Sequence, residues 1–283
     1  MPRIDLAGTG IACMEVGSGE TVLLLHATAS AGDQWRSLAE KLLPGRRVLA
    51  PDLYGYGESD PWPGFGAYTL AAEVQLVEAL LPPGEGKVHL VGHSYGGAVA
   101  LRFAMRHPER LRSLVLIEPV AFHLLRDGVP DPEDRRLFRE ARALATLVWQ
   151  AMASGDYRGA MAAFIDYWNG GGAWMRLKPE LQEALTRRLP KVALDFHAVM
   201  SDPTPLVAYR RMAVPTLLLR GSESPGPARR VAEILAERLP QARLRTIEGA
   251  GHMLPLTHKD AVNAAIAEHM FRGTAGRGHP AAA

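Results

Sequence analysis

The stretch "VHLVGHSYGGAVALRFA", residues 88–104, holds a serine whose neighbours suit it for nucleophilic attack. An apolar run ends at Gly92, and a helical pattern begins directly after Ser94, with Gly96 two residues beyond. Glycines on both sides give room where a strand turns sharply into a helix, so the serine hydroxyl is exposed at the turn. The helix N-terminus then directs free N–H groups toward developing negative charge. The pattern therefore predicts a nucleophilic serine rather than an incidental one in a glycine-rich turn.

Short apolar runs alternate with helical patterns along the chain, which indicates parallel strands joined by right-handed crossovers. The predicted strands are 11–16, 21–26, 47–52, 87–92, 111–117, 216–220 and 243–247, and the predicted helices are 34–43, 70–81, 95–106, 228–239 and 259–270. The alternation breaks between about Val120 and Met212, where amphipathic patterns such as "RRLFREARALATLVWQAM" occur without a convincing strand. A helical insertion of this kind predicts a cap over the carboxyl ends of the strands, where such sheets bind ligands.

Together these features resemble the α/β-hydrolase superfamily over nearly the whole chain apart from the insertion. Three more motifs occur in the family's order: "LLLHATAS" resembles its oxyanion loop, "APDLYGYGESD" its Asp-x-x-Gly-x-Gly-x-Ser turn, and "EGAGHMLPLTH" its catalytic histidine loop. The resemblance implies an α/β fold with a mostly parallel eight-stranded sheet, flanking helices and a helical cap. We expect a core of residues 1–119 and 213–272, a cap of residues 120–212 and a flexible tail of residues 273–283.

The same resemblance implies a general base and two oxyanion donors. His252, in a Gly-Ala-Gly-His turn after the last predicted strand, is expected to take the proton of Ser94 and return it to the leaving group. The backbone N–H groups of Tyr95 and Thr28 are the expected oxyanion donors. Ala27 stands where the family usually has glycine, so its Cβ restricts this loop.

The acid of the expected triad is not in its usual seat, because Ser224 occupies that position after the strand "TLLLR". Glu118 ends the apolar run after the nucleophile's own strand, and neighbouring parallel strands end at the same edge of a sheet. Certain haloalkane dehalogenases look similar in placing the acid there. We therefore predict Glu118 as the acid and leave Ser224 as a neutral neighbour. The alternatives that stay open are a Glu118 that only caps the turn before Pro119, and Glu223, Glu248, Asp52 or Asp60 as the acid.

A serine nucleophile favours acyl transfer over the aspartate chemistry of haloalkane dehalogenases and epoxide hydrolases in this superfamily. The prediction is a carboxylic-ester hydrolase, or one acting on a related acyl bond, for small and fairly apolar substrates through an acyl-enzyme. Hydrolysis of a carbon–carbon bond in a diketone-like substrate, thioester or lactone hydrolysis, cyanohydrin cleavage and a non-catalytic small-ligand receptor remain alternatives. Candidate pocket residues are His26, which the resemblance assigns to support of the oxyanion loop, and Trp149, Phe164, Tyr167, Trp168 and Trp174.

Composition and charge limit which partners, compartments and cofactors are expected for this protein. The chain has 283 residues with a formal net charge of +2, and its basic clusters alternate with acids, so no nucleic-acid partner is expected. Cys13 is the single cysteine, which allows no internal disulfide. No apolar run has the length of a signal peptide or a membrane span, so we expect a cytoplasmic protein. Metal-ligand spacing and a dinucleotide fingerprint are both absent, which predicts a reaction without metal or cofactor on a small-molecule substrate.

Overall fold

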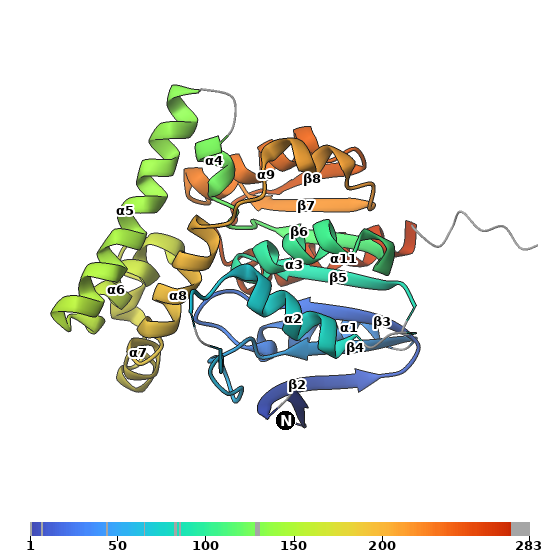
Figure 1. The fold of residues 1–283 in the computed structure, drawn as a ribbon, viewed down its shortest axis with the longest axis horizontal. Helices are drawn as coiled ribbons and strands as arrows, with labels where there is room; N and C mark the ends of the chain where they lie inside the picture. Colours follow the sequence, from blue (N-terminus) through green and yellow to red (C-terminus); the bar gives the residue numbers. More distant parts are fainter. Residues whose placement is uncertain are drawn as a thin grey trace, which may run out of the picture.

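The computed structural model describes residues 2–6, 8–43, 45–64, 66–81, 84, 86–127 and 131–272, so the predicted flexible tail lies outside the described residues. Its strands are β1 (Arg3–Leu6), β2 (Thr9–Gly17), β3 (Glu20–Leu25), β4 (Arg46–Pro51), β5 (Val88–His93), β6 (Leu111–Ile117), β7 (Thr216–Gly221) and β8 (Ala242–Ile247). They form one sheet in the order β1-β2-β4-β3-β5-β6-β7-β8 (Figure 1). The pairs β1–β2 and β2–β4 are antiparallel and all others are parallel, which confirms the predicted sheet.

Helices cover both faces of the sheet because side chains alternate along each strand. On β3, Leu23 and Leu25 join one core cluster, and Val22 and Leu24 join the other. The first cluster packs against α2 (Leu70–Leu80), α3 (Tyr95–Arg106) and α9 (Gly226–Arg238). The second packs against α1 (Arg36–Leu42) and α11 (Lys259–Arg272). Burial on both faces explains why the strands appear in the sequence as continuous apolar runs.

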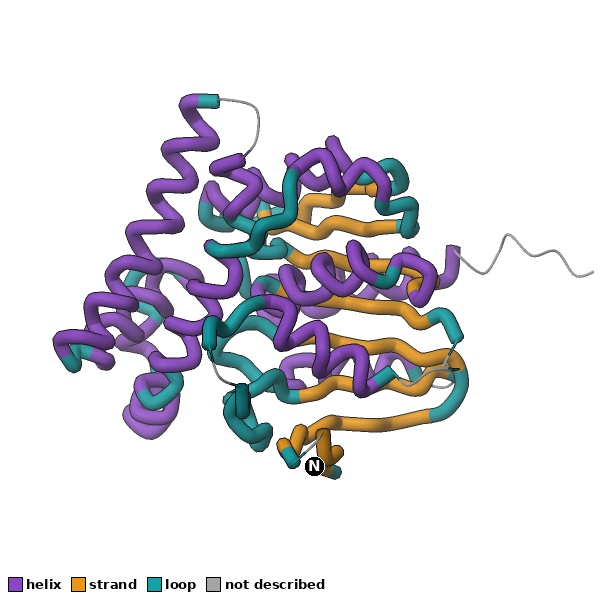
Figure 2. The backbone as a smooth tube through the Cα atoms, viewed as in Figure 1, coloured by secondary structure: helices purple, strands orange, loops and turns teal. Residues whose placement is uncertain are grey.

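A helical insertion follows β6 and ends before β7. It consists of α4 (His123–Asp127), α5 (Pro132–Ser154), α6 (Tyr157–Asn169), α7 (Pro179–Thr186) and α8 (Leu189–Met200), with a 3₁₀ turn at Leu206–Arg211. Asp131 starts α5 by accepting a hydrogen bond from the N–H of Glu133, and Gly155 ends it at a φ of 80°. Helices α5 to α8 lie beside the carboxyl ends of the parallel strands (Figures 1 and 2).

No helix among the described residues is both long and apolar enough to cross a membrane. No group of three or more histidine, cysteine, aspartate or glutamate side chains in the described part of the chain is arranged to hold a metal ion.

Candidate active site

Ser94 occupies a strained turn between β5 and α3. Its backbone has a φ of 55° and a ψ of −115°, a conformation that non-glycine residues rarely adopt. The two flanking glycines are needed for the turn. A Cβ on Gly92 would lie 2.3 Å from the carbonyl oxygen of Gly96, and a Cβ on Gly96 would lie 2.4 Å from that of Leu25. The tight turn therefore places Ser94 directly after β5, at the carboxyl edge of the sheet, where the glycine pattern predicted it.

Ser94, His252 and Glu118 form one buried hydrogen-bonded chain. The Ser94 hydroxyl donates to Nε2 of His252 at 2.9 Å, and Nδ1 of the same ring donates to Oε2 of Glu118 at 2.6 Å. The other carboxylate oxygen of Glu118 accepts the backbone N–H of Gly221 at 2.7 Å. His252 lies in the loop between β8 and α10 (Leu254–Thr257), and Glu118 directly follows β6. The arrangement leaves Nε2 free of a proton and able to accept one from serine.

The residues directly after β7 contribute no carboxylate to the hydrogen bonds that join Ser94, His252 and Glu118. Glu223 is exposed, and its backbone N–H donates to the carbonyl oxygen of Ala250. Ser224 is buried, and among the described residues its hydroxyl oxygen has no hydrogen-bond partner. Of the carboxylates considered from the sequence, Glu118 is the one that contacts the His252 ring.

The two residues predicted as oxyanion donors line the cavity into which Ser94 opens. Tyr95 is the first residue of α3, so its N–H has no acceptor within the helix. Thr28 lies in the loop after β3. The neighbouring N–H of Ala27 donates to Oε1 of Gln34 at 3.2 Å, which removes Ala27 as a competing donor. The geometry therefore favours Thr28 over Ala27.

His26 and His93 support the loops around Ser94, and neither lines the two cavities into which Ser94 opens, so His26 is not the pocket residue that we expected from the sequence. Nε2 of His26 accepts the N–H of Leu53 at 2.9 Å, and Nδ1 donates to the carbonyl of Ala27 at 2.7 Å. Nε2 of His93 donates to the carbonyl oxygen of His252 at 2.9 Å. The His93 bond ties the serine turn to the histidine loop. Gln34 was not predicted from the sequence. Its amide nitrogen donates to Nδ1 of His93 at 3.1 Å and its amide oxygen accepts the N–H of Ala27, so it connects the serine turn to the loop after β3.

The burial of these two rings predicts that stability declines in acid. Burial lowers the pKa of His26 from 6.5 to about 3 and holds the pKa of His93 well below 6.5. The unfolded chain therefore binds more protons than the folded protein once the pH falls below 6.5. The contribution of each buried ring to the free energy of unfolding is fully present above that pH. Below it, this contribution falls by about 1.4 kcal/mol per pH unit for each histidine. Urea unfolding at about pH 7 and about pH 5 measures the slope; equal values contradict neutral burial.

Two cavities meet at Ser94 and share four lining residues, Thr28, Ser94, Phe164 and Trp168. The smaller has about 280 Å³ including its open mouth and is mainly apolar, with Val120, Phe122, Phe196 and Val199 in its wall and Tyr95 and Asp195 as polar neighbours. The larger has about 980 Å³ including its open mouth. His252 lines only the larger cavity, together with Arg188 and residues of α7 such as Leu181 and Leu185. The two spaces therefore differ in size and in access to the histidine.

The tryptophans of the insertion have different roles. Trp168 lines both cavities, and its ring lies 4.1 Å from the His252 ring, centroid to centroid. Trp149 and Trp174 line neither cavity, contrary to our expectation. Trp149 is 37% exposed and donates its indole N–H to the carbonyl of Ala193 in α8, whereas Trp174 packs against the guanidinium of Arg158 at 5.4 Å. These two side chains join helices of the insertion to one another. Of the other candidates, Phe164 lines both cavities, and Tyr167 donates its hydroxyl to Oε1 of Glu140.

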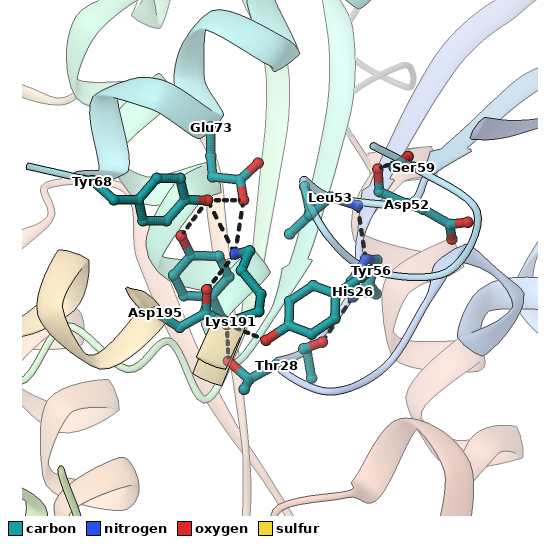
Figure 3. A network of polar contacts seen from close by, with 12 residues as sticks. His26, Thr28, Asp52, Leu53, Tyr56, Ser59, Tyr68, Glu73, Lys191 and Asp195 are labelled. Carbon is teal, nitrogen blue, oxygen red and sulfur yellow. Dashed lines mark hydrogen bonds and ion pairs between the residues drawn. The ribbon is translucent and has the colours of Figure 1, made fainter. Parts of the chain in front are cut away.

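A buried polar network beside Ser94 was not predicted. Lys191 and Asp195 of α8 meet Glu73 of α2 and a group of tyrosines, as Figure 3 shows. One signal was present in the sequence. Lys191 and Asp195 are four residues apart in the otherwise apolar segment "LPKVALDF", so they share one face of the helix.

Comparison with known proteins agrees with this fold. Residues 20–259 match the family described as alpha/beta hydrolase fold. Pimeloyl-[acyl-carrier protein] methyl ester esterase of Aeromonas hydrophila is 28% identical over 255 residues, covering 86% of this chain and 92% of that esterase. Lipase LipV of Mycobacterium tuberculosis is 42% identical over 99 residues, and this match spans only 35% of this chain and 36% of LipV. A thermophilic esterase from Thermogutta terrifontis, solved with malate bound, has a TM-score of 0.72 at 25% identity, covering 96% and 99% of the two chains.

Proposed function

This chain belongs to the alpha/beta hydrolase fold family, and we propose that it is a serine hydrolase that cleaves a carboxylic ester or a related acyl bond. The observation that carries the proposal is the buried Ser94–His252–Glu118 chain, whose hydroxyl opens onto two cavities. Relatives named as esterase and lipase agree with hydrolysis of an acyl bond. The helical insertion acts as a cap in this proposal, because Phe164, Trp168 and Val199 supply walls above Ser94.

The mechanism follows from these contacts. Ser94 Oγ attacks the carbonyl carbon while Nε2 of His252 takes its proton, and Glu118 holds the ring and stabilises the resulting imidazolium. The negative charge on the carbonyl oxygen is received by the N–H groups of Tyr95 and Thr28. His252 then protonates the departing alcohol, which leaves an acyl-enzyme on Ser94. In the second half, His252 takes a proton from water while the water oxygen attacks the acyl carbon; the bond to Ser94 Oγ then breaks, His252 returns the proton to Oγ, and the acid departs.

The positions of the residues around Ser94 suggest which part of the substrate enters each cavity. The leaving group must lie near His252, which protonates it, and His252 lines only the larger cavity. The smaller cavity has Tyr95 in its wall and lacks His252. We therefore assign the acyl chain to the smaller cavity and the alcohol to the larger one. The preferred substrates are esters of short, apolar acids with comparatively bulky alcohols.

An ester series tests both the activity and this assignment. We expect kcat/KM to fall about 10- to 200-fold when the acyl chain of a nitrophenyl ester is lengthened from butyryl to octanoyl, because the smaller cavity has little room for added methylenes. Lengthening the alcohol of a butyrate ester is expected to have a smaller effect. The measurement is initial-rate hydrolysis over the whole series, with ring-fission diketones included as competing substrates.

Two variants control the series. Val199→Ala enlarges only the smaller cavity, so it is expected to recover activity on octanoyl esters. Leu181→Ala, in the wall of the larger cavity alone, is expected to change the acceptance of alcohols and to leave the acyl preference as it is. A preference for long acyl chains with small alcohols contradicts the assignment of the cavities. Cleavage of diketones with no hydrolysis of any ester contradicts the ester proposal.

A further inference from the structure

The ammonium group of Lys191 is enclosed beneath the loop that carries Thr28. Its side chain is 9% exposed, and Nζ lies 4.7 Å from the ring centroid of each of three tyrosines, Tyr56, Tyr68 and Tyr95. Nζ also donates to the Tyr68 hydroxyl at 3.0 Å and to Oε1 of Glu73 at 3.2 Å, and its third partner is Oδ1 of Asp195 (Figure 3). All three donors of the ammonium are therefore used, and aromatic faces complete its surroundings.

The partners of Lys191 contact both residues proposed as oxyanion donors. Oδ2 of Asp195 accepts the Thr28 hydroxyl at 2.7 Å and the Tyr56 hydroxyl at 2.6 Å. The Tyr95 hydroxyl donates to the Tyr68 hydroxyl at 3.3 Å, and Tyr68 in turn accepts from Lys191. One ammonium group thus lies at the centre of the contacts that hold the Thr28 and Tyr95 side chains.

The loop after β3 is held from α8 at a second point. Ala29, next to Thr28, has a φ of 59°, which costs free energy for a residue with a Cβ. Arg188, at the start of α8, donates to the carbonyl oxygen of Ala29 at 2.6 Å. A strained loop needs such ties to keep one conformation. Here they come from the helical insertion, although the loop belongs to the sheet.

Two buried carboxyl groups share one ammonium group in this network. They are Asp195 and Glu73, and the ammonium belongs to Lys191. Burial is the largest cause that raises the pKa of each carboxyl group, and Lys191 opposes it in both. Asp195 accepts three hydrogen bonds on its two oxygens. Glu73 accepts two, from Tyr68 and Lys191, both on Oε1, and its Oε2 has no partner among the described residues. Asp195 therefore has the more complete set of hydrogen bonds of the two carboxyl groups, and it is also the one that contacts Thr28.

We propose that Lys191 and Asp195 are positioning residues that hold the backbone N–H groups of Thr28 and Tyr95 where an oxyanion forms. The proposal rests on the serine-hydrolase function proposed above. Preorganised donors act on the transition state much more than on the bound substrate. Loss of the ties should therefore lower kcat and leave KM nearly unchanged.

Thr28→Val and Asp195→Asn test this proposal in the full chain. Valine keeps the shape of threonine and removes only the hydroxyl that bonds Asp195. We expect each variant to lower kcat about 10- to 100-fold, as a donor displaced by a fraction of an ångström does. Affinity for a boronic acid, which forms a tetrahedral adduct with the serine, should fall by the same factor as kcat/KM. Thr28→Ser, which keeps a hydroxyl at this position, should retain most of the parent kcat.

Asp134→Asn is the matched control for a weakened contact between the insertion and the sheet domain. Asp134 of α5 is buried and pairs with Arg230 of α9 at 2.7 Å, and neither residue lines a cavity at Ser94. This variant should lower the melting temperature and keep kcat.

Folded Thr28→Val protein with unchanged kcat and boronate affinity, or with a change in KM alone, overturns the positioning role. That result leaves the proposed function intact if Ser94→Ala is inactive; an active Ser94→Ala protein overturns the function itself. If Asp195→Asn does not fold, Thr28→Val alone decides.

Discussion

Replacing Ser94 by alanine is expected to lower kcat on the best ester by a factor on the order of 10⁶, the size of loss seen when a serine nucleophile is removed from such a constellation. Alanine keeps the Cβ that the strained turn already accommodates at a φ of 55°. Among the described residues, the side-chain bond lost is the hydrogen bond from the hydroxyl to Nε2 of His252. The fold should therefore survive while the attacking atom is missing.

The measurement for this variant is kcat from initial rates, together with a melting curve that shows the protein is folded. Ser113→Ala is a suitable control, because Ser113 is another buried serine of the sheet whose hydroxyl bonds Nδ1 of His89 away from both cavities. The control should keep kcat. A Ser94→Ala enzyme within about tenfold of the original rate would mean that another group attacks the substrate.

Replacing Glu118 by glutamine is expected to lower kcat about 10⁴-fold, as the loss of the orienting carboxylate does in a related triad. Glu118 receives two donors, Nδ1–H of His252 and the N–H of Gly221, one on each oxygen. An amide offers only one acceptor, so its NH₂ must face one of these donors. The histidine then adopts the wrong tautomer or turns away from Ser94, and Nε2 can no longer take the serine proton.

Glu223→Gln separates the two acids that the sequence left in competition. Glu223 is exposed, and Nδ1 of His252 already donates to Glu118, so this variant should keep the original kcat. The pair is compared by kcat on one ester at a pH where the parent enzyme is fully active. The opposite pattern, with full activity in Glu118→Gln and loss in Glu223→Gln, makes the assignment of the acid wrong.

The position of Glu118 could be predicted because it depends on neighbouring strands. β5 and β6 pair in parallel, with His93 opposite Ile117. Ser94 and Glu118 are the next residues on the two strands, so they leave the sheet side by side. Chain order, apolar runs and the glycine pattern around Ser94 were enough to place both. The serine in the usual acid position, Ser224, favoured an acid from the neighbouring strand, and Glu223 stayed open as an alternative.

The lining of the cavities could not be predicted in the same way, because it depends on how the insertion packs on the sheet. An amphipathic pattern predicts a helix but does not identify its neighbour. Trp149 and Trp168 both lie on helices of the insertion, yet only Trp168 lines the cavities. The Lys191 network likewise joins α8 to α2 through side chains far apart in sequence. β1 was missed for a local reason: "RIDL" is four residues long and has no extended apolar run.

Covalent labelling with a fluorophosphonate tests the central claim, a serine nucleophile activated by His252 and Glu118, most directly. The account predicts one adduct per chain, located on the Ser94 peptide by mass spectrometry and absent in Ser94→Ala. Labelling should be much slower in Glu118→Gln and unchanged in Glu223→Gln. An unlabelled parent enzyme, or an adduct that persists in Ser94→Ala, would contradict it.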